Sequence, residues 1–200
     1  MNQIIRNEFQ KAIKDGNINK VKSLILLGAD LNENIGIFPE DTPIALAAFE
    51  EKIDIVALLT KEGAEVDPKC EGFDSALQYS IIKKRRDIAE LLIKNGANLK
   101  FRGEADLSVL HIAINMYNPD FDSEVFDIIV FLVINGADVN AKRNLGDTPL
   151  HYAASGGCIK LLKYLIASGA DATTLDQDGN TAYDIAVSKG FSDAAELLRC

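Results

Sequence analysis

Two histidines and three cysteines are the side chains of this 200-residue sequence best suited to neutral-pH catalysis or metal binding. His111 and His151 are candidate general acids or bases, because imidazole titrates close to neutral pH. Neither lies in an H-E-x-x-H pattern, and the sequence contains no G-x-S-x-G and no G-x-x-x-x-G-K-[ST]. No nucleophile is paired with a base. We therefore predict that the chain is not an enzyme and has no catalytic residues.

The cysteines suggest neither a metal site nor a disulfide framework. Cys70, Cys158 and Cys200 are an odd number, lie far apart and include no C-x-x-C pair. With only two histidines to complete a ligand set, free thiols in a reducing compartment are favoured. We expect no metal and no cofactor.

Charge and hydropathy exclude further classes of function. The formal net charge at pH 7 is −9, which repels a nucleic-acid backbone. The one basic run, residues 83–86, contains no aromatic residue and is interpreted as a solvated turn between helices. The N-terminus lacks the apolar region of a signal peptide, and no apolar run reaches the length of a membrane span. We expect a cytoplasmic protein without membrane contact, although a secretion signal read by a dedicated export machine is compatible with this sequence.

Two motifs recur along the chain at one period. A Gly-Ala-acid or Gly-Ala-amide triplet occurs five times, with spacings of 35, 33, 40 and 33 residues, at Gly28, Gly63, Gly96, Gly136 and Gly169. A second motif begins twelve residues after each of the last four glycines and fourteen after the first. It starts with Thr or Ser and is most complete in Thr148-Pro149-Leu150-His151-Tyr152-Ala153. Two motifs in register indicate stacked structural repeats.

Each repeat is expected to form two short antiparallel helices. The Thr or Ser hydroxyl can cap the free amides of the first helix, and proline suits the first helical position. The second helix has an apolar periodicity, as in residues 159–165, and stops at a glycine that can adopt the left-handed conformation. Such helix pairs bury their apolar faces only against neighbouring pairs. The period of 33 and the T-P-L-H-x-A pattern resemble the ankyrin-repeat family over essentially the whole chain.

The resemblance implies an all-α ankyrin-repeat solenoid of about six stacked helix pairs with short hairpin fingers. We predict a single domain over residues 1–200, with approximate repeats 1–35, 36–68, 69–101, 102–141, 142–174 and 175–200. The first and last repeats act as caps, and the first carries helices around Ile4–Lys14 and Ile18–Leu27. The resemblance also implies that His111 and His151 tie adjacent repeats together by hydrogen bonds. The periodic acids Asp30, Glu65, Asp138 and Asp171 are interpreted as turn residues.

The fourth repeat is seven residues longer than its neighbours between its two motifs. The extra length falls in residues 115–124, where Pro119 and a cluster of Asn and Asp disfavour helix. We therefore predict a longer loop between the two helices of this repeat. Repeat proteins often carry insertions on their binding face, but a tolerated surface loop also costs little, and the sequence leaves both readings open.

In ankyrin proteins, the fingers and the exposed side of each first helix form a concave groove that binds protein partners. The register of the repeat then gives the candidate partner-binding residues. They are Phe38, Phe49, Glu50, Phe73, Ile82, Lys83, Phe101, Asn115, Met116, Tyr117, Asn144, Leu145, Asp147 and Ser155. Large apolar side chains that recur on an exposed face favour a protein contact. Irregular fingers that fold over and bury these aromatics are the alternative.

Acidic residues surround the predicted groove and favour a protein partner with a basic rim. They are Glu33, Glu40, Asp41, Glu50, Glu71, Asp74, Glu104, Asp106, Asp147, Asp176 and Asp178. The sequence thus predicts a non-catalytic protein–protein interaction module, monomeric when unbound, such as a bacterial or pathogen adaptor, inhibitor or immunity factor. Two alternatives stay open: a self-associating scaffold, and a ligand-binding or enzymatic protein that uses residues 115–124 as a lid.

Overall fold

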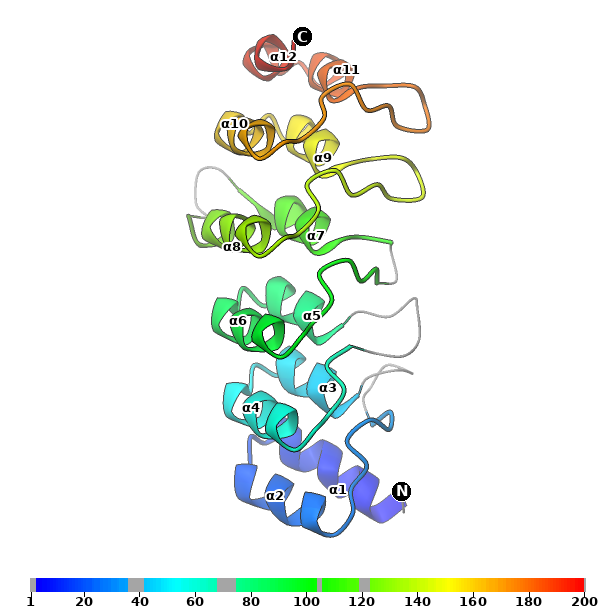
Figure 1. The fold of residues 1–200 in the computed structure, drawn as a ribbon, viewed down its shortest axis with the longest axis vertical. Helices are drawn as coiled ribbons and strands as arrows, with labels where there is room; N and C mark the ends of the chain where they lie inside the picture. Colours follow the sequence, from blue (N-terminus) through cyan, green and yellow to red (C-terminus); the bar gives the residue numbers. More distant parts are fainter. Residues whose placement is uncertain (1–2, 36–41, 68–74, 104–105, 119–122, 200) are drawn as a thin grey trace. The chain divides into compact units, whose positions relative to one another are not determined.

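The computed structural model describes residues 3–35, 42–67, 75–103, 106–118 and 123–199. Within these ranges the chain forms twelve helices and no β-strand, which confirms the predicted all-α ankyrin-type fold. The chain divides into two compact units, Met1–Ala105 and Asp106–Cys200. Helix pairs follow one another along each unit (Figure 1). That residues 1–200 act as one domain stays a prediction.

The first unit contains three helix pairs. Its helices are α1 (Gln3–Lys14), α2 (Ile18–Leu26), α3 (Pro43–Phe49), α4 (Ile53–Lys61), α5 (Ala76–Ile82) and α6 (Arg86–Lys94). The first helices stack, α1 on α3 and α3 on α5, and the second helices stack beside them. The two helices predicted for the first repeat are confirmed to within one residue at each end. Phe9, Ile44 and Leu77 are fully buried between the pairs, so stacking forms the core.

The second unit also contains three helix pairs. Its helices are α7 (Val109–Met116), α8 (Ser123–Ile134), α9 (Pro149–Ser155), α10 (Ile159–Ala167), α11 (Ala182–Ser188) and α12 (Ser192–Leu198). Helix α9 packs on both α7 and α11, and α10 packs on α12. Leu150 and Leu162 are buried at these contacts.

The first helices begin where the Thr or Ser motif predicts. Thr42 and Ser75 are the residues before α3 and α5, and each side-chain oxygen accepts a hydrogen bond from the amide three residues later. Gln78 returns the bond by accepting from the Ser75 amide at 2.8 Å. Pro43 and Pro149 occupy the first helical positions, where no amide partner is required. Local chemistry therefore sets these helix starts.

The insertion in the fourth repeat lengthens the loop between its two helices, as predicted, but part of it also lengthens the second helix. Helix α7 continues through Met116, and α8 already begins at Ser123 and has 12 residues, against nine in α4, α6 and α10. Only residues 117–122 join the two helices, and 119–122 lie outside the described residues. Part of the inserted length extends α8 because Glu124 suits a first helical turn and the following apolar run continues the buried face.

Side chains at one repeat position connect successive turns. Asn140 accepts a hydrogen bond from the Asp171 amide at 2.8 Å and donates its own amide to the Gly169 carbonyl at 2.9 Å. In the first unit, Asp67 holds the equivalent position and accepts from the Asn98 amide at 2.8 Å. Its second carboxylate oxygen is buried and has no hydrogen-bond partner among the described residues. Burial raises the pKa of Asp67 above its ordinary value of 3.8, although the bond from Asn98 lowers it.

Replacing Asp67 by Asn should raise the free energy of unfolding by about 1 kcal/mol at neutral pH, because an amide can donate where the carboxylate oxygen is unsatisfied. Since the folded pKa of Asp67 is raised, its carboxyl stabilises the fold most below pH 3.8, and this contribution is lost as the pH rises through the folded value. The gain from Asp67→Asn should therefore shrink on acidification. Urea unfolding at several pH values measures it. Asn140→Asp is the reverse control and should destabilise; equal effects of the two variants would contradict the argument.

Candidate partner-binding surface

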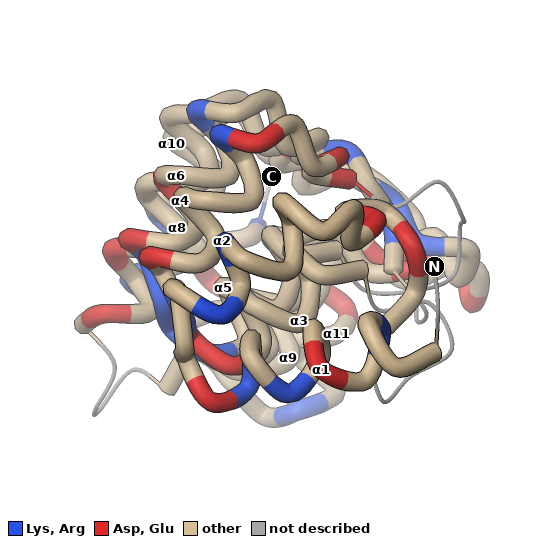
Figure 2. Tube along the Cα trace, turned by 90° about the horizontal axis from the view of Figure 1, so that it is seen from below, with Lys and Arg blue, Asp and Glu red and all other residues tan. Residues whose placement is uncertain are grey.

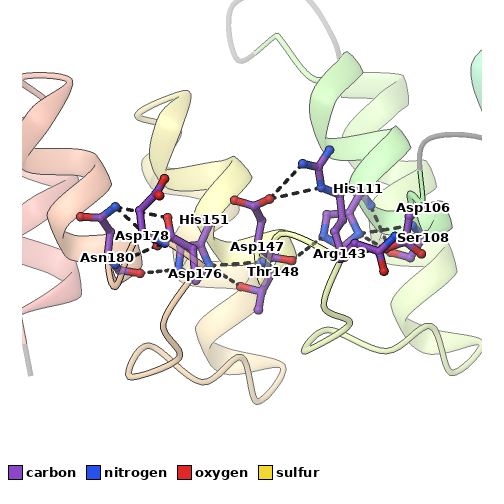
Figure 3. Close-up of polar contacts among 11 residues, drawn as sticks. Asp106, Ser108, His111, Arg143, Asp147, Thr148, His151, Asp176, Asp178 and Asn180 are labelled. Atoms are coloured by element: carbon purple, nitrogen blue, oxygen red, sulfur yellow. Dashed lines mark hydrogen bonds and ion pairs between the residues drawn. The ribbon is translucent and has the colours of Figure 1, made fainter.

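The two histidines bridge adjacent repeats of the second unit (Figure 3). His111 Nε2 lies 3.3 Å from the Asp147 carbonyl, and His151 Nε2 lies 3.2 Å from the Asn180 carbonyl. Because a carbonyl only accepts, Nε2 carries the proton and Nδ1 accepts, from Ser108 in one case and Thr148 in the other. Both rings are buried. Nε2 of each ring thus holds the next finger, as the resemblance implied, while Nδ1 holds the start of the first helix in the ring's own repeat.

The fingers of the second unit are held to one another through their backbones. The amide of Asn144 donates to the Asp106 carboxylate, and the amide of Gln177 donates to the Leu145 carbonyl at 2.9 Å. Gly146 has φ +78°, and a Cβ atom there would lie 3.1 Å from the Asp176 Cα. Glycine therefore permits the close approach of the two fingers. A surface fixed in this way loses little conformational entropy when it binds.

A polar hollow of about 320 Å³ opens between these fingers and the first helices of the second unit. Its lining comes from α7, α9, α11 and the two fingers. It consists of Asn115, Arg143, Leu145, Asp147, His151, Tyr152, Ser155, Asp176, Gln177, Asp178 and Ile185. Three carboxylates thus face one guanidinium, beside the apolar surfaces of Leu145, Tyr152 and Ile185.

The single guanidinium of the hollow is already paired. Arg143 Nε and Nη2 lie 3.2 and 3.1 Å from the same oxygen of Asp147, Oδ2 (Figure 3). The guanidinium carbon is also 5.6 Å from the centroid of the Tyr152 ring. Burial raises the pKa of the Tyr152 hydroxyl, an effect that the charge of Arg143 partly opposes. The hollow keeps a negative balance because Asp176 and Asp178 face no second cation in its lining.

The second unit brings together four of the residues predicted for partner binding. Asn115, Leu145, Asp147 and Ser155 all line the hollow. Asn144 is exposed on the same finger as Leu145, whereas Met116 is half-buried at the end of α7. Tyr117 lies elsewhere: its ring centroid is 5.9 Å from that of Phe126 on α8. A partner-binding role for each of these residues stays a prediction.

In the first unit, a cation covers part of the apolar surface that was predicted to bind a partner. Phe49 packs edge-on against Tyr79, with ring centroids 5.4 Å apart, and Lys83 Nζ lies 4.0 Å from the Phe49 centroid. Ile82 is 38% exposed, while Glu50 and Phe101 are half-buried. The predicted residues Phe38 and Phe73 lie outside the described residues. The structure thus exposes Ile82 on this face but covers part of Phe49 with Lys83.

Sequence reasoning missed several residues of the hollow and its rim. Arg143, Tyr152 and Ile185 line it, and Leu175 on the sixth finger is 54% exposed. A large apolar residue within the polar finger 174–180 was the available signal for Leu175. Nothing in the repeat pattern pairs Arg143 with Asp147, because that pair depends on how the finger turns.

Acidic and basic residues are both distributed along the chain trace (Figure 2). Among the residues whose placement is described, no group of three or more His, Cys, Asp or Glu could hold a metal ion. No helix in the described ranges is long and apolar enough to cross a membrane.

Stacked helix pairs joined by hydrogen-bonded fingers define a repeat protein. A family model for ankyrin repeats in three copies matches residues 9–103 and 110–200. The chain therefore belongs to the ankyrin-repeat family. Ankyrin repeats are protein–protein interaction modules, and the match names no catalytic family.

Relatives with this repeat occur in diverse proteins. Ankyrin repeat domain-containing protein 37 of Xenopus tropicalis is 44% identical over 63 residues, covering 32% of this chain and 39% of that protein. The nuclear factor NF-kappa-B p105 subunit of Gallus gallus is 27% identical over 188 residues, covering 90% of this chain and 18% of that protein. The chain thus spans well under half the length of these relatives.

Solved structures also resemble this chain, and one of them matches nearly its full length. It is a chain in the complex of the predatory endopeptidase Bd0816 from Bdellovibrio bacteriovorus with the immunity protein Bd3460. The match covers 96% of both chains at a TM-score of 0.72 and 28% sequence identity.

Proposed function

We propose that this chain is a non-catalytic module that binds a protein partner through the fingers and first helices of its repeats. The observation that carries the proposal is the pair of exposed leucines on the joined fingers of the second unit. Leu145 is 41% exposed and Leu175 is 54% exposed, beside the polar hollow. Apolar side chains held rigidly at the rim of a polar surface are typical of protein contacts.

The use of the two histidines supports the proposal that the chain is non-catalytic. Each ring donates one hydrogen bond to a carbonyl and accepts at its other nitrogen within a buried site. A general base needs a lone pair that substrate can reach, and neither ring offers one in this arrangement. The hollow supplies carboxylates and amides that suit recognition rather than a nucleophile activated by a base.

We further propose that the partner carries a basic rim and that this chain acts as an inhibitor or immunity factor. Asp147, Asp176 and Asp178 give the finger surface an acidic character that would speed the association of a basic partner. The likeness to a chain from a complex of an endopeptidase with an immunity protein supports this role. The unbound chain is monomeric in this proposal.

Capture of the partner from native cell lysate should depend on the finger leucines. We expect the wild-type chain to retain one protein that the double variant Leu145→Ser, Leu175→Ser loses, because the contact then buries less apolar surface. Ile134→Ser is the matched control: Ile134 is 76% exposed at the end of α8, away from the fingers. Quantitative mass spectrometry of the retained proteins measures the effect.

The control variant decides how a loss of capture is interpreted. Loss with both the finger variant and Ile134→Ser would indicate general instability, which circular dichroism would show as reduced helix content. Retention by the folded finger variant would contradict the proposal. If the captured protein is an enzyme, its activity with and without this chain tests the inhibitory role, and light scattering of the pure chain tests the monomer.

A further inference from the structure

We propose that the polar hollow of the second unit receives one cationic side chain of the protein partner, an arginine or a lysine. This inference rests on the proposed function and names the chemistry that the site recognises. The hollow, of about 320 Å³, lies between the two joined fingers and the helices α7, α9 and α11. Its size and position suit a single long side chain that points inward from a bound protein surface.

The lining offers more hydrogen-bond acceptors than its own donors use. Both Arg143 contacts go to Oδ2 of Asp147, so Oδ1 takes no hydrogen bond within the described part of the chain. The Asp178 carboxylate likewise accepts none there; the backbone amide of Asp178 donates to Asp176 instead. The side-chain amides of Asn115 and Gln177 add two further carbonyl oxygens. A ligand rich in donors would satisfy this set.

Charge selects a cation among such ligands. Asp147, Asp176 and Asp178 outnumber Arg143, whose guanidinium already contacts Asp147. A carboxylate or phosphate ligand would meet net repulsion and would have to break this ion pair. A neutral donor would leave the excess negative charge uncompensated, whereas a guanidinium or ammonium group compensates it.

The apolar part of the lining suits the aliphatic stem of such a side chain. Tyr152 and Ile185 are half-buried and face the hollow together with Leu145. The methylene groups of arginine or lysine can lie along these surfaces while the charged head reaches the carboxylates. Asp176 is fixed by bonds from the Asp178 and Asn180 amides, 2.9 and 2.8 Å long, which holds the finger in place for the ligand.

The test uses the intact chain and small probes. Proton–nitrogen correlation spectra are titrated with N-acetyl-arginine amide, N-acetyl-lysine amide and, as a neutral shape match of arginine, N-acetyl-citrulline amide. We expect saturable shifts at Asn115, Ser155 and Gln177 with a charged probe and none with citrulline. Raised salt should weaken the response, because exposed charges are screened.

Variants that each remove one negative charge then locate the contact. Asp178→Asn should weaken binding of the charged probe by about threefold, in line with the loss of one exposed ion pair. Asp127→Asn, the same change at an exposed position on α8, should leave it unchanged. Equal shifts with citrulline, shifts spread over acidic residues outside the lining, or equal effects of the two variants would overturn the inference.

The two proposals fail in different ways. If partner capture depends on Leu145 and Leu175 but neither charged probe binds the hollow, the function stands and the cationic anchor is wrong. If the charged probe binds the hollow while capture ignores the finger leucines, the hollow recognises cations but the proposed docking surface is wrong.

Discussion

Replacing Gly157 by alanine is expected to lower the free energy of unfolding by about 2–4 kcal/mol, because the site excludes a side chain in two ways. The backbone of Gly157 has φ +64°, which L residues adopt only with strain. A Cβ atom at this position would also lie 2.6 Å from Cδ1 of the Phe191 ring. Urea unfolding followed by circular dichroism measures the loss of stability. Hydrogen exchange in α9–α12 should show which helices are destabilised.

A second glycine separates the two contributions. Gly179 has φ +78° with no atom within 4 Å of its Cβ position, so Gly179→Ala should cost only the backbone term, about 1–2 kcal/mol. In a Phe191→Ala background, Gly157→Ala should cost no more than this. If its cost is the same with and without the Phe191 ring, the steric explanation is incorrect.

Replacing His111 by alanine should lower the free energy of unfolding by about 3–5 kcal/mol, since it leaves buried polar groups unsatisfied and creates a cavity. The ring links Ser108, at the start of its own repeat, to the Asp147 carbonyl in the next finger. Its removal therefore loosens the connection between α7 and the fifth finger as well as the helix start. Urea unfolding measures the loss of stability. Faster hydrogen exchange at residues 143–148 would show that the fifth finger has been loosened.

Two variants show whether the bridge or the helix start matters. Asp184 holds the equivalent position in α11, and within the described part of the chain its carboxylate bonds only to Thr181 of its own repeat, so Asp184→Ala should cost much less. His111→Gln keeps an acceptor for Ser108, as Gln78 does for Ser75, and should give an intermediate loss. A His111→Ala effect no larger than that of Asp184→Ala would mean that the bond to the next repeat contributes little.

The candidate surface was predictable only as far as the repeat register reaches. Asn115, Leu145, Asp147 and Ser155 were found because equivalent positions of stacked repeats fall on one side of each helix pair. The partners of individual side chains were not predictable. Lys83 lies over the Phe49 ring and Tyr117 packs beside Phe126, because long side chains choose among several neighbours after the helices have packed.

The sequence by itself determined the fold, because each helix start, apolar face and terminal glycine is a local property repeated at one period. Thr42 caps the start of α3, and Gly136, with φ +94°, terminates α8. Both features depend only on residues nearby in the sequence. Only the tertiary structure decided which fingers join, how much of the insertion becomes α8, and that Arg143 pairs with Asp147 in the fifth finger. The joining of the fingers depends on contacts between residues about thirty apart in sequence, such as Leu145 with Gln177, whose geometry exists only after the repeats have stacked.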